Sequence, residues 1–325
     1  MATPPLTDAP WIAPVWRRLC ERHREGRLGH GLLLGGSGPL GQSELATALA
    51  GLILCEAPTA EGACGACRAC TWLASATHPD LLRVGLAERE DGRLRSEILV
   101  EQVRAVTHDL GLTTHQGGAM VVCIEPADAL NPAAANALLK TLEEPAAGRY
   151  LLLVTARPDA LPATVRSRCQ KWMLRPPARA EALAWLRAQG IAAAAASEAL
   201  DWASGQPLQA LELARSDGLA LCREVATQLD ELASGRLGPT AVAAVWAGDR
   251  PDARLRAAVA AVARRGWAPS GLTAAVDFTK LAAWSRQADR ARALLDVPLR
   301  HELLLAELLQ SWCGLHRSRA AARRG

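Results

Sequence analysis

The 325-residue chain has no strong excess of either charge, no long apolar run and few aromatic residues other than tryptophan. Its formal net charge of +4 does not by itself indicate a dedicated nucleic-acid binder, for which a pI above roughly 9 and clustered Lys and Arg are expected. No stretch of about 18 apolar residues predicts a membrane span, and the first residues lack the basic and apolar regions of a signal peptide. We therefore expect a cytoplasmic protein of two or three domains, with proteins as its partners.

A lysine is also missing, from what is otherwise a phosphate-binding loop. Residues 36–43, GSGPLGQS, keep Gly36, Gly41 and Ser43 of the pattern G-x-x-x-x-G-K-[ST] but have Gln42 in place of the lysine. An apolar run before the loop and a helical pattern after it supply the strand, turn and helix N-terminus of such a site. Gln42 cannot neutralise β- and γ-phosphates, so we do not expect ATP to bind productively. The alternative is a glycine-rich turn with no nucleotide-binding ancestry.

Four cysteines, in contrast, are concentrated within sixteen residues. Cys55, Cys64, Cys67 and Cys70 have the spacing C-x8-C-x2-C-x2-C. Four thiolates complete the tetrahedral coordination of Zn²⁺ and exclude water, which predicts a structural zinc site. The alternatives are an iron–sulfur cluster, whose usual C-x2-C-x2-C-x3-C-P run is absent, and unrelated free thiols. We expect His78 to be a packed or turn-capping residue. The remaining cysteines are expected to be core thiols: Cys20, Cys123, Cys169, Cys222 and Cys313.

A second apolar run, at residues 120–124, has the length of a central parallel strand and ends in Glu125-Pro126. Glu125 is placed to reach a Mg²⁺ ion, but Pro126 removes the second carboxylate that would polarise an attacking water. A helix is predicted over residues 131–145, with Asn131 as its N-cap, and a further strand over residues 150–155. This alternation predicts a doubly wound parallel sheet.

Two motifs in this region resemble the clamp-loader branch of the AAA+ ATPases. They are NALLKTLEEP at residues 136–145 and the tripeptide Ser167-Arg168-Cys169, together with the cysteine module after the loop. The similarity to the clamp-loader subunits of bacterial DNA polymerase III is specific over residues 29–177 and weaker beyond. The resemblance implies an α/β AAA+ domain with an inserted zinc module, followed by all-α lid and collar domains. Active ATPase subunits of the family carry the lysine and an Asp-Glu pair that this chain lacks.

The resemblance also implies a role for Arg168. In the family this arginine enters the ATP site of the adjacent subunit, where a planar guanidinium suits bidentate contact with γ-phosphate oxygens. Without the surrounding motif, an arginine at the edge of a domain is more often a surface ion-pair partner. Thr155 occupies the position named sensor 1 in relatives, and the alternative is that it only caps the following turn.

The chain breaks at Arg175-Pro176-Pro177, because two successive prolines end the preceding strand. We expect a nucleotide-binding-like domain at residues 1–175, a helical lid at 176–216 and a helical collar at 217–325. The lid has Gly205-Gln206-Pro207 where active relatives place a sensor-2 arginine. An apolar stripe in the collar is either core or subunit interface, and it comprises Leu304, Leu305, Leu308, Leu309 and Trp312. A basic tail is either a phosphate contact or solvated, and it comprises Arg317, Arg319, Arg323 and Arg324.

The leading hypothesis is a non-hydrolysing subunit of a hetero-oligomeric clamp loader. The resemblance implies gamma or tau and delta subunits as partners, and a sliding clamp and primer-template DNA as partners of the whole complex. One alternative is an active P-loop ATPase with an unusual loop. Another is a zinc-dependent DNA-binding module, although Arg68 is the only basic residue inside the cysteine cluster.

Overall fold

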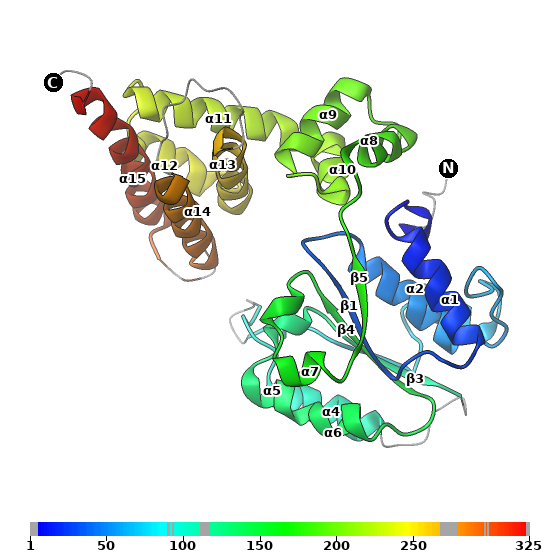
Figure 1. Ribbon diagram of the computed structural model, residues 1–325. Coiled ribbons are helices and arrows are strands. Elements are labelled where there is room, and N and C mark those ends of the chain that lie inside the picture. Colours follow the sequence, from blue (N-terminus) through cyan, green and yellow to red (C-terminus); the bar gives the residue numbers. More distant parts are fainter. Residues whose placement is uncertain are drawn as a thin grey trace. The chain divides into compact units, whose positions relative to one another are not determined.

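The computed structural model describes residues 6–89, 92, 94–110, 118–266, 278–295, 297 and 299–322. The chain divides into two compact units, Met1–Glu181 and Ala182–Gly325 (Figure 1). The further division of the second unit into lid and collar stays a prediction. The arginine side chains of the basic tail (Arg317, Arg319, Arg323 and Arg324) lie outside the described part of the chain.

The first unit is built on a parallel five-stranded sheet, as predicted. The strands are β1 Gly31–Gly36, β2 Leu81–Val84, β3 Met120–Ile124, β4 Arg149–Thr155 and β5 Gln170–Leu174. Their order is β2-β3-β4-β1-β5, so β1 lies in the interior of the sheet. Every residue of β1 and β3 is buried, which explains their continuous apolar sequences. The short edge strand β2 is not predicted from the sequence.

Helices cover both faces of this sheet. They are η1 Leu6–Asp8, α1 Ala13–Arg24, α2 Gln42–Leu54, α3 Arg68–Ala74, α4 Val100–Leu110, η2 Ala127–Ala129, α5 Pro132–Ala137, α6 Leu139–Glu143, η3 Pro158–Ala160 and α7 Ala163–Arg166. Figure 1 shows α1 and α2 on one face and α4 to α7 on the other. Leu33, Val122 and Leu153 of the sheet share a core with the second group of helices.

The single helix predicted over residues 131–145 was wrong, because the structure has two short helices separated at Leu138. The N-cap was correct, since Asn131 Oδ1 accepts a hydrogen bond from Ala134 N at 2.8 Å. Leu138 is fully buried at the junction, and Leu142 of α6 is buried in the same core. The interruption therefore falls at a position whose side chain packs against the sheet.

The described part of the second unit is helical. Its helices are α8 Arg179–Ala188, α9 Ala193–Trp202, α10 Pro207–Arg215, α11 Gly218–Ser234, α12 Pro239–Gly248, α13 Pro251–Gly266, α14 Phe278–Ala293 and α15 His301–Ala322. One core connects residues from α8 to α15. Trp246, Trp284 and Trp312 are fully buried there, and each indole N–H donates a hydrogen bond. Leu305, Leu308, Leu309 and Trp312 are also buried, which confirms that most of the apolar stripe is core.

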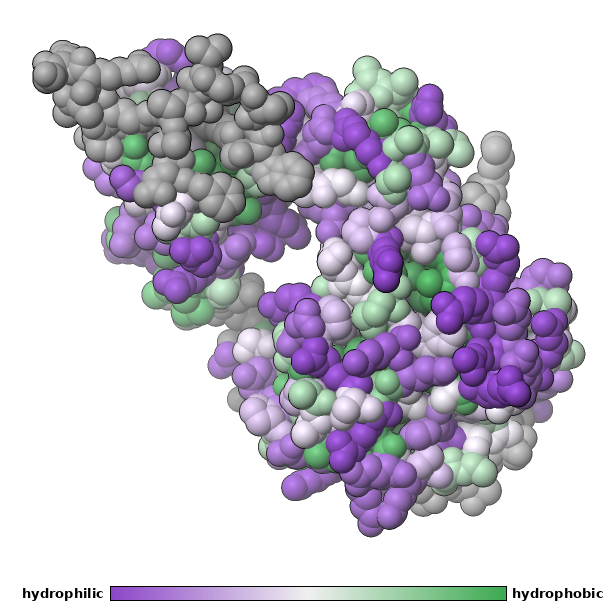
Figure 2. Space-filling model, in the orientation of Figure 1, coloured by the Kyte–Doolittle hydropathy of each residue, from purple (hydrophilic) through white to green (hydrophobic). Residues whose placement is uncertain are grey.

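On the coloured part of the surface in Figure 2, hydrophilic residues are widespread and apolar residues lie in small groups between them. Among the described helices, none combines the length and the apolar character needed to cross a membrane.

Candidate functional site

The degenerate phosphate loop connects the carboxyl end of β1 to the start of α2. Gly38 and Gly41 have φ of 99° and 97°, a left-handed conformation that glycine adopts without strain. Gly41 is the residue immediately before α2, so Gln42 and Ser43 begin the helix. The local backbone thus provides the turn and helix N-terminus that the sequence predicted.

The side chain of Gln42 folds back into this loop and is almost completely buried, with 5% of its surface exposed. Its Oε1 accepts a hydrogen bond from Leu40 N at 2.9 Å, and its Nε2 donates to Gly38 O at 2.7 Å. A Cβ atom at Gly36 would lie only 2.6 Å from Gln42 Nε2, so the glycine makes room for the carboxamide. One loop N–H that would face an anion therefore has a partner within the chain.

The acidic residue after β3 is also engaged. The Ser43 hydroxyl donates a short hydrogen bond to Glu125 Oε1. In a working P-loop site, the serine at this position and an acid at the end of the neighbouring strand hold Mg²⁺. Here the two groups bind each other, and Pro126 follows Glu125 in place of a second carboxylate. The structure thus brings together Gly36, Gly41, Gln42, Ser43 and Glu125 at the carboxyl edge of the sheet.

Arg168 lies two residues before β5 begins, at the amino ends of the parallel strands. The phosphate loop lies at their carboxyl ends. All five strands are parallel, so the amino end of β5 and the carboxyl end of β1 lie at opposite edges. The Arg168 side chain is 34% exposed and forms an ion pair with Glu143. Arg168 is therefore separated from the phosphate loop of its own chain by the length of the sheet.

A polar network joins the ends of β3 and β4. Thr155 Oγ1 donates to Asp128 Oδ1 at 2.6 Å and accepts from Arg157 N at 2.9 Å. The Arg157 guanidinium contacts Asp128 Oδ2 at 2.6 Å and 2.8 Å. Thr155 therefore does cap the turn after its strand, as one of the two readings predicted. The sequence analysis missed Asp128 and Arg157, whose pairing requires the parallel register of β3 and β4.

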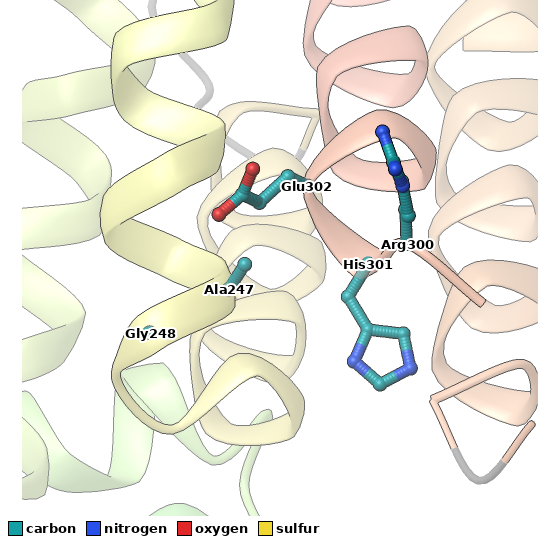
Figure 3. Close-up of a pocket in the computed structure, with 5 residues that line it drawn as sticks. All are labelled: Ala247, Gly248, Arg300, His301 and Glu302. Atoms are coloured by element: carbon teal, nitrogen blue, oxygen red, sulfur yellow. The ribbon is translucent and has the colours of Figure 1, made fainter. Parts of the chain in front are cut away.

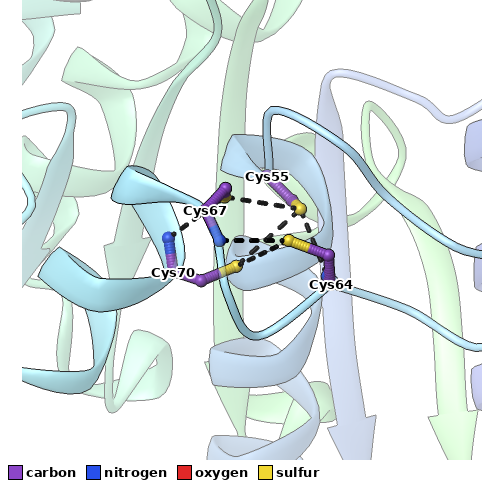
Figure 4. A group of neighbouring side chains, drawn as sticks. All are labelled: Cys55, Cys64, Cys67 and Cys70. Atoms are coloured by element: carbon purple, nitrogen blue, oxygen red, sulfur yellow. Dashed lines mark hydrogen bonds between the residues drawn. The ribbon is translucent and has the colours of Figure 1, made fainter.

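The four cysteines form one cluster (Figure 4). Cys55 follows α2, Cys64 lies in the connecting loop, Cys67 caps α3 and Cys70 lies within α3. Their sulfur atoms are 3.7 Å, 3.8 Å and 3.9 Å apart in the pairs Cys55–Cys70, Cys55–Cys67 and Cys64–Cys70. A tetrahedron of sulfurs at about 2.3 Å from a central Zn²⁺ has edges of about 3.8 Å. The donor set and its spacing thus fit a structural zinc ion, whereas the sulfurs are too far apart for disulfides.

Backbone N–H groups point at three of these sulfurs. Cys64 N, Cys67 N and Cys70 N donate to the preceding cysteine of the cluster at 3.3 Å, 3.3 Å and 3.5 Å. The donation from Cys70 N lowers the pKa of Cys67 to about 6, and burial raises the pKa of Cys70 to about 12. The thiolate is the form of cysteine that binds a metal ion. The hydrogen bonds to Cys67 Sγ therefore favour the metal-binding form of this side chain.

The loop that connects Cys55 to Cys64 contacts α1. Trp16 Nε1 donates to Glu61 O at 2.9 Å, and a Cβ atom at Gly62 would lie 2.9 Å from Trp16 Cζ2. Arg68, the basic residue within the cluster, is stacked on Trp72 with its Cζ atom 4.2 Å from the ring centroid. A DNA-binding role of the cluster would depend on Arg68. One face of its guanidinium is occupied by the contact with Trp72.

The remaining candidates have structural roles. His78 is buried, and its Nδ1 accepts a hydrogen bond from Asp80 N at 3.1 Å, which confirms the turn-capping prediction. The five scattered cysteines are buried as expected: Cys20, Cys123, Cys169, Cys222 and Cys313. Burial raises the pKa of Cys123, Cys169 and Cys222 to about 11, so these thiols stay protonated at neutral pH.

A recess of about 420 Å³ lies in the second unit, between the end of α12 and the start of α15 (Figure 3). It is lined by Ala247, Gly248, Arg300, His301 and Glu302. No residue of the sequence-predicted sites lines it.

Comparisons with known proteins agree with the motifs. The sequence model of a family described as "DNA polymerase III, delta subunit" matches residues 12–178, which is just over half of the chain. DNA polymerase III subunit delta' of Pseudomonas aeruginosa is 40% identical over 207 residues, or 63% of this chain and 60% of the relative. The Escherichia coli K12 subunit delta' is 38% identical over 209 residues, or 64% and 61%. The alignment thus spans about three fifths of the length of these relatives.

Two more distant similarities were also found. DNA polymerase III subunit tau of Salmonella typhimurium is 32% identical over 150 residues, or 46% of this chain and 22% of the relative. A solved structure of a DNA polymerase III gamma subunit-related protein from Thermotoga maritima covers 93% of this chain and 98% of its own. Its TM-score is 0.46 and its identity is 15%.

Proposed function

Because this chain belongs to the family described as DNA polymerase III, delta subunit, with delta' subunits as relatives, we propose that it is a non-hydrolysing subunit of a clamp loader. In this role it works in the cytoplasm with gamma or tau and delta subunits to place a sliding clamp on primed DNA. It supplies Arg168 to the ATP site of a neighbouring subunit.

The observation that carries this proposal is the placement of the Gln42 side chain within its own phosphate loop. The carboxamide is bonded to Leu40 N and Gly38 O, and it brings no positive charge. Pro126 stands in place of the second carboxylate, so a further requirement of hydrolysis, a base for water, is also missing from the motif. The loop thus retains the backbone of a nucleotide site but lacks the lysine of the motif, which supports a subunit without hydrolytic activity.

The position of Arg168 supports action on another chain. It is exposed, and the length of the sheet separates it from the loop of its own chain. Arginines supplied in trans accelerate phosphoryl transfer by about 10³ to 10⁵, which corresponds to roughly 4 to 7 kcal/mol of barrier. A subunit without hydrolytic activity can therefore control a neighbour's ATP turnover.

The Cys55, Cys64, Cys67 and Cys70 cluster is proposed to hold one structural Zn²⁺ ion. Four sulfur ligands leave no position for water, so the metal would stabilise the connection between α2 and α3 and take no part in ATP chemistry.

The test is single-turnover ATP hydrolysis by a loader reconstituted with Arg168→Ala, in the presence of clamp and primed DNA. In the loader that contains Arg168→Ala, the ATP site that Arg168 serves is the last to react. Hydrolysis at that site is therefore the slowest phase. We expect this phase to slow at least about tenfold, since the variant lacks the charge that stabilises the transition state.

Arg166→Ala is the matched control, because Arg166 is a nearby arginine whose partner is Asp159 in the same chain. Unchanged hydrolysis with Arg168→Ala in an intact complex would refute the role in trans. Vigorous hydrolysis by the isolated chain would refute the proposal that the subunit is inert.

A further inference from the structure

The guanidinium of Arg168 is held by two groups of its own chain. Its Nε donates to Glu143 Oε1 at 2.7 Å, its NH2 forms an ion pair with the same oxygen, and its NH1 donates to Thr164 O at 2.9 Å. A guanidinium has five N–H donors. These contacts use three of them and leave one N–H on each terminal nitrogen without a partner among the described residues. Two N–H groups on adjacent nitrogens can bind phosphate oxygens in a bidentate manner.

The backbone next to Glu143 is anchored through the preceding residue, Leu142. Glu143 is the last residue of α6, and the preceding Leu142 is buried in the core of the first unit. His30 Nε2 donates to Leu142 O at 2.8 Å. A Cβ atom at Gly31 would lie 2.6 Å from Leu142 Cδ2, so the end of α6 packs directly on the start of β1.

The backbone of Arg168 is equally well anchored. Val165 and Cys169, on either side of it, are both buried, and Arg168 N donates to Val165 O at 3.1 Å. The backbones of both ion-pair partners are therefore anchored by neighbouring residues in the hydrophobic core. Exposed ion pairs contribute little to stability, so orientation is the effect that this pair can supply.

We propose that Glu143 is a positioning residue for Arg168: it holds one side of the guanidinium and presents the edge with two remaining N–H groups to a phosphate outside the chain. This inference rests on the proposed role of Arg168 in trans. Glu143 touches no substrate and acts through Arg168 alone. A fixed donor pair loses less conformational freedom when the transition state forms than a mobile side chain does.

The experiment measures the slowest single-turnover phase in the reconstituted loader as a function of ATP concentration. We expect Glu143→Ala to slow the maximal rate about tenfold, and Glu143→Gln, which retains an acceptor oxygen, about threefold. The ATP concentration at half-maximal rate should stay within about twofold. Glu144→Ala is the control, because it removes the same charge from the adjacent exposed residue, which does not contact Arg168.

Each outcome separates the two proposals. If Arg168→Ala slows the phase but Glu143→Ala matches Glu144→Ala, the positioning role fails and the function of Arg168 stands. If Arg168→Ala has no effect, the proposed function itself fails. A faster phase in Glu143→Ala would show that Glu143 restrains the arginine, which also overturns the inference. Finally, Glu143→Ala must have no further effect in an Arg168→Ala background, since any additional loss would mean that Glu143 acts through another group.

Discussion

Gln42 changes the phosphate loop in two ways. It replaces the positively charged lysine of the motif, and its carboxamide forms hydrogen bonds with Leu40 N and Gly38 O of the loop itself. Replacing Gln42 with lysine should reverse both effects. We expect Gln42→Lys to increase the affinity of the isolated chain for ATP at least about tenfold, as measured by calorimetry, since an ammonium next to the phosphates is restored. Hydrolysis should stay absent, because Pro126 still occupies the place of the second carboxylate.

Gln310→Lys provides the matched control for this experiment. Gln310 is exposed on α15 of the second unit, so the substitution changes the net charge equally without touching the loop. Equal ATP affinities for Gln42→Lys and Gln310→Lys would mean that the loop is closed by more than this one side chain.

The limits of prediction are clear at the same residues. The missing lysine, the acid before Pro126 and the four cysteines are visible in the sequence, because each belongs to a motif of fixed spacing. The partner of Arg168 is not visible, since Glu143 lies 25 positions away and meets it only after α6 and α7 pack on the sheet. Likewise, the sequence shows that Gln42 lacks a charge but not that its carboxamide turns back onto Leu40 and Gly38.

The cysteine module is a short connection between α2 and α3 in which residues 56–61 are exposed, so a metal ion is expected to order it. We expect about one zinc per chain in the purified protein and none in a Cys64→Ser, Cys67→Ser variant. The variant should also be cleaved faster by proteases within residues 56–66, because the loop loses its cross-link.

Cys169→Ser is the control for this loss, since Cys169 is a buried thiol outside the cluster. It should retain the zinc. A metal content that is the same in all three proteins, or absent from the unmodified chain, would contradict the structural zinc site.

The whole molecule consists of two units with separate cores, and the second unit has one core that runs through both its lid-like and collar-like helices. We therefore expect residues 176–325, expressed alone, to fold and to unfold in a single cooperative transition monitored by circular dichroism. Two transitions would show that residues 176–216 and 217–325 are independent domains, and an unfolded fragment would show that the second unit depends on the first.

The overall architecture was more predictable than its details. The buried runs at β1, β3 and β4 and the apolar periodicity of the later helices determine the α/β and all-α parts. The edge strand β2 was missed because its sequence, Leu81-Leu82-Arg83-Val84, is only four residues long and is interrupted by a charged residue, which leaves a weak strand signal. The break at Leu138 was missed because helix propensity and N-capping are local signals, and neither marks an interruption at a residue that is buried in the core with the sheet.

The internal bonds of Gln42 have a consequence for how the subunit responds to its surroundings. A diffusible nucleotide competes for a site through its concentration, whereas a tethered group acts at a fixed effective concentration, of the order of millimolar for short flexible links. A nucleotide that binds the Leu40 N–H must therefore first displace the Gln42 carboxamide. In the proposed clamp loader, this subunit would keep one geometry while neighbouring sites fill and empty, and Arg168 would reach its neighbour from a constant position.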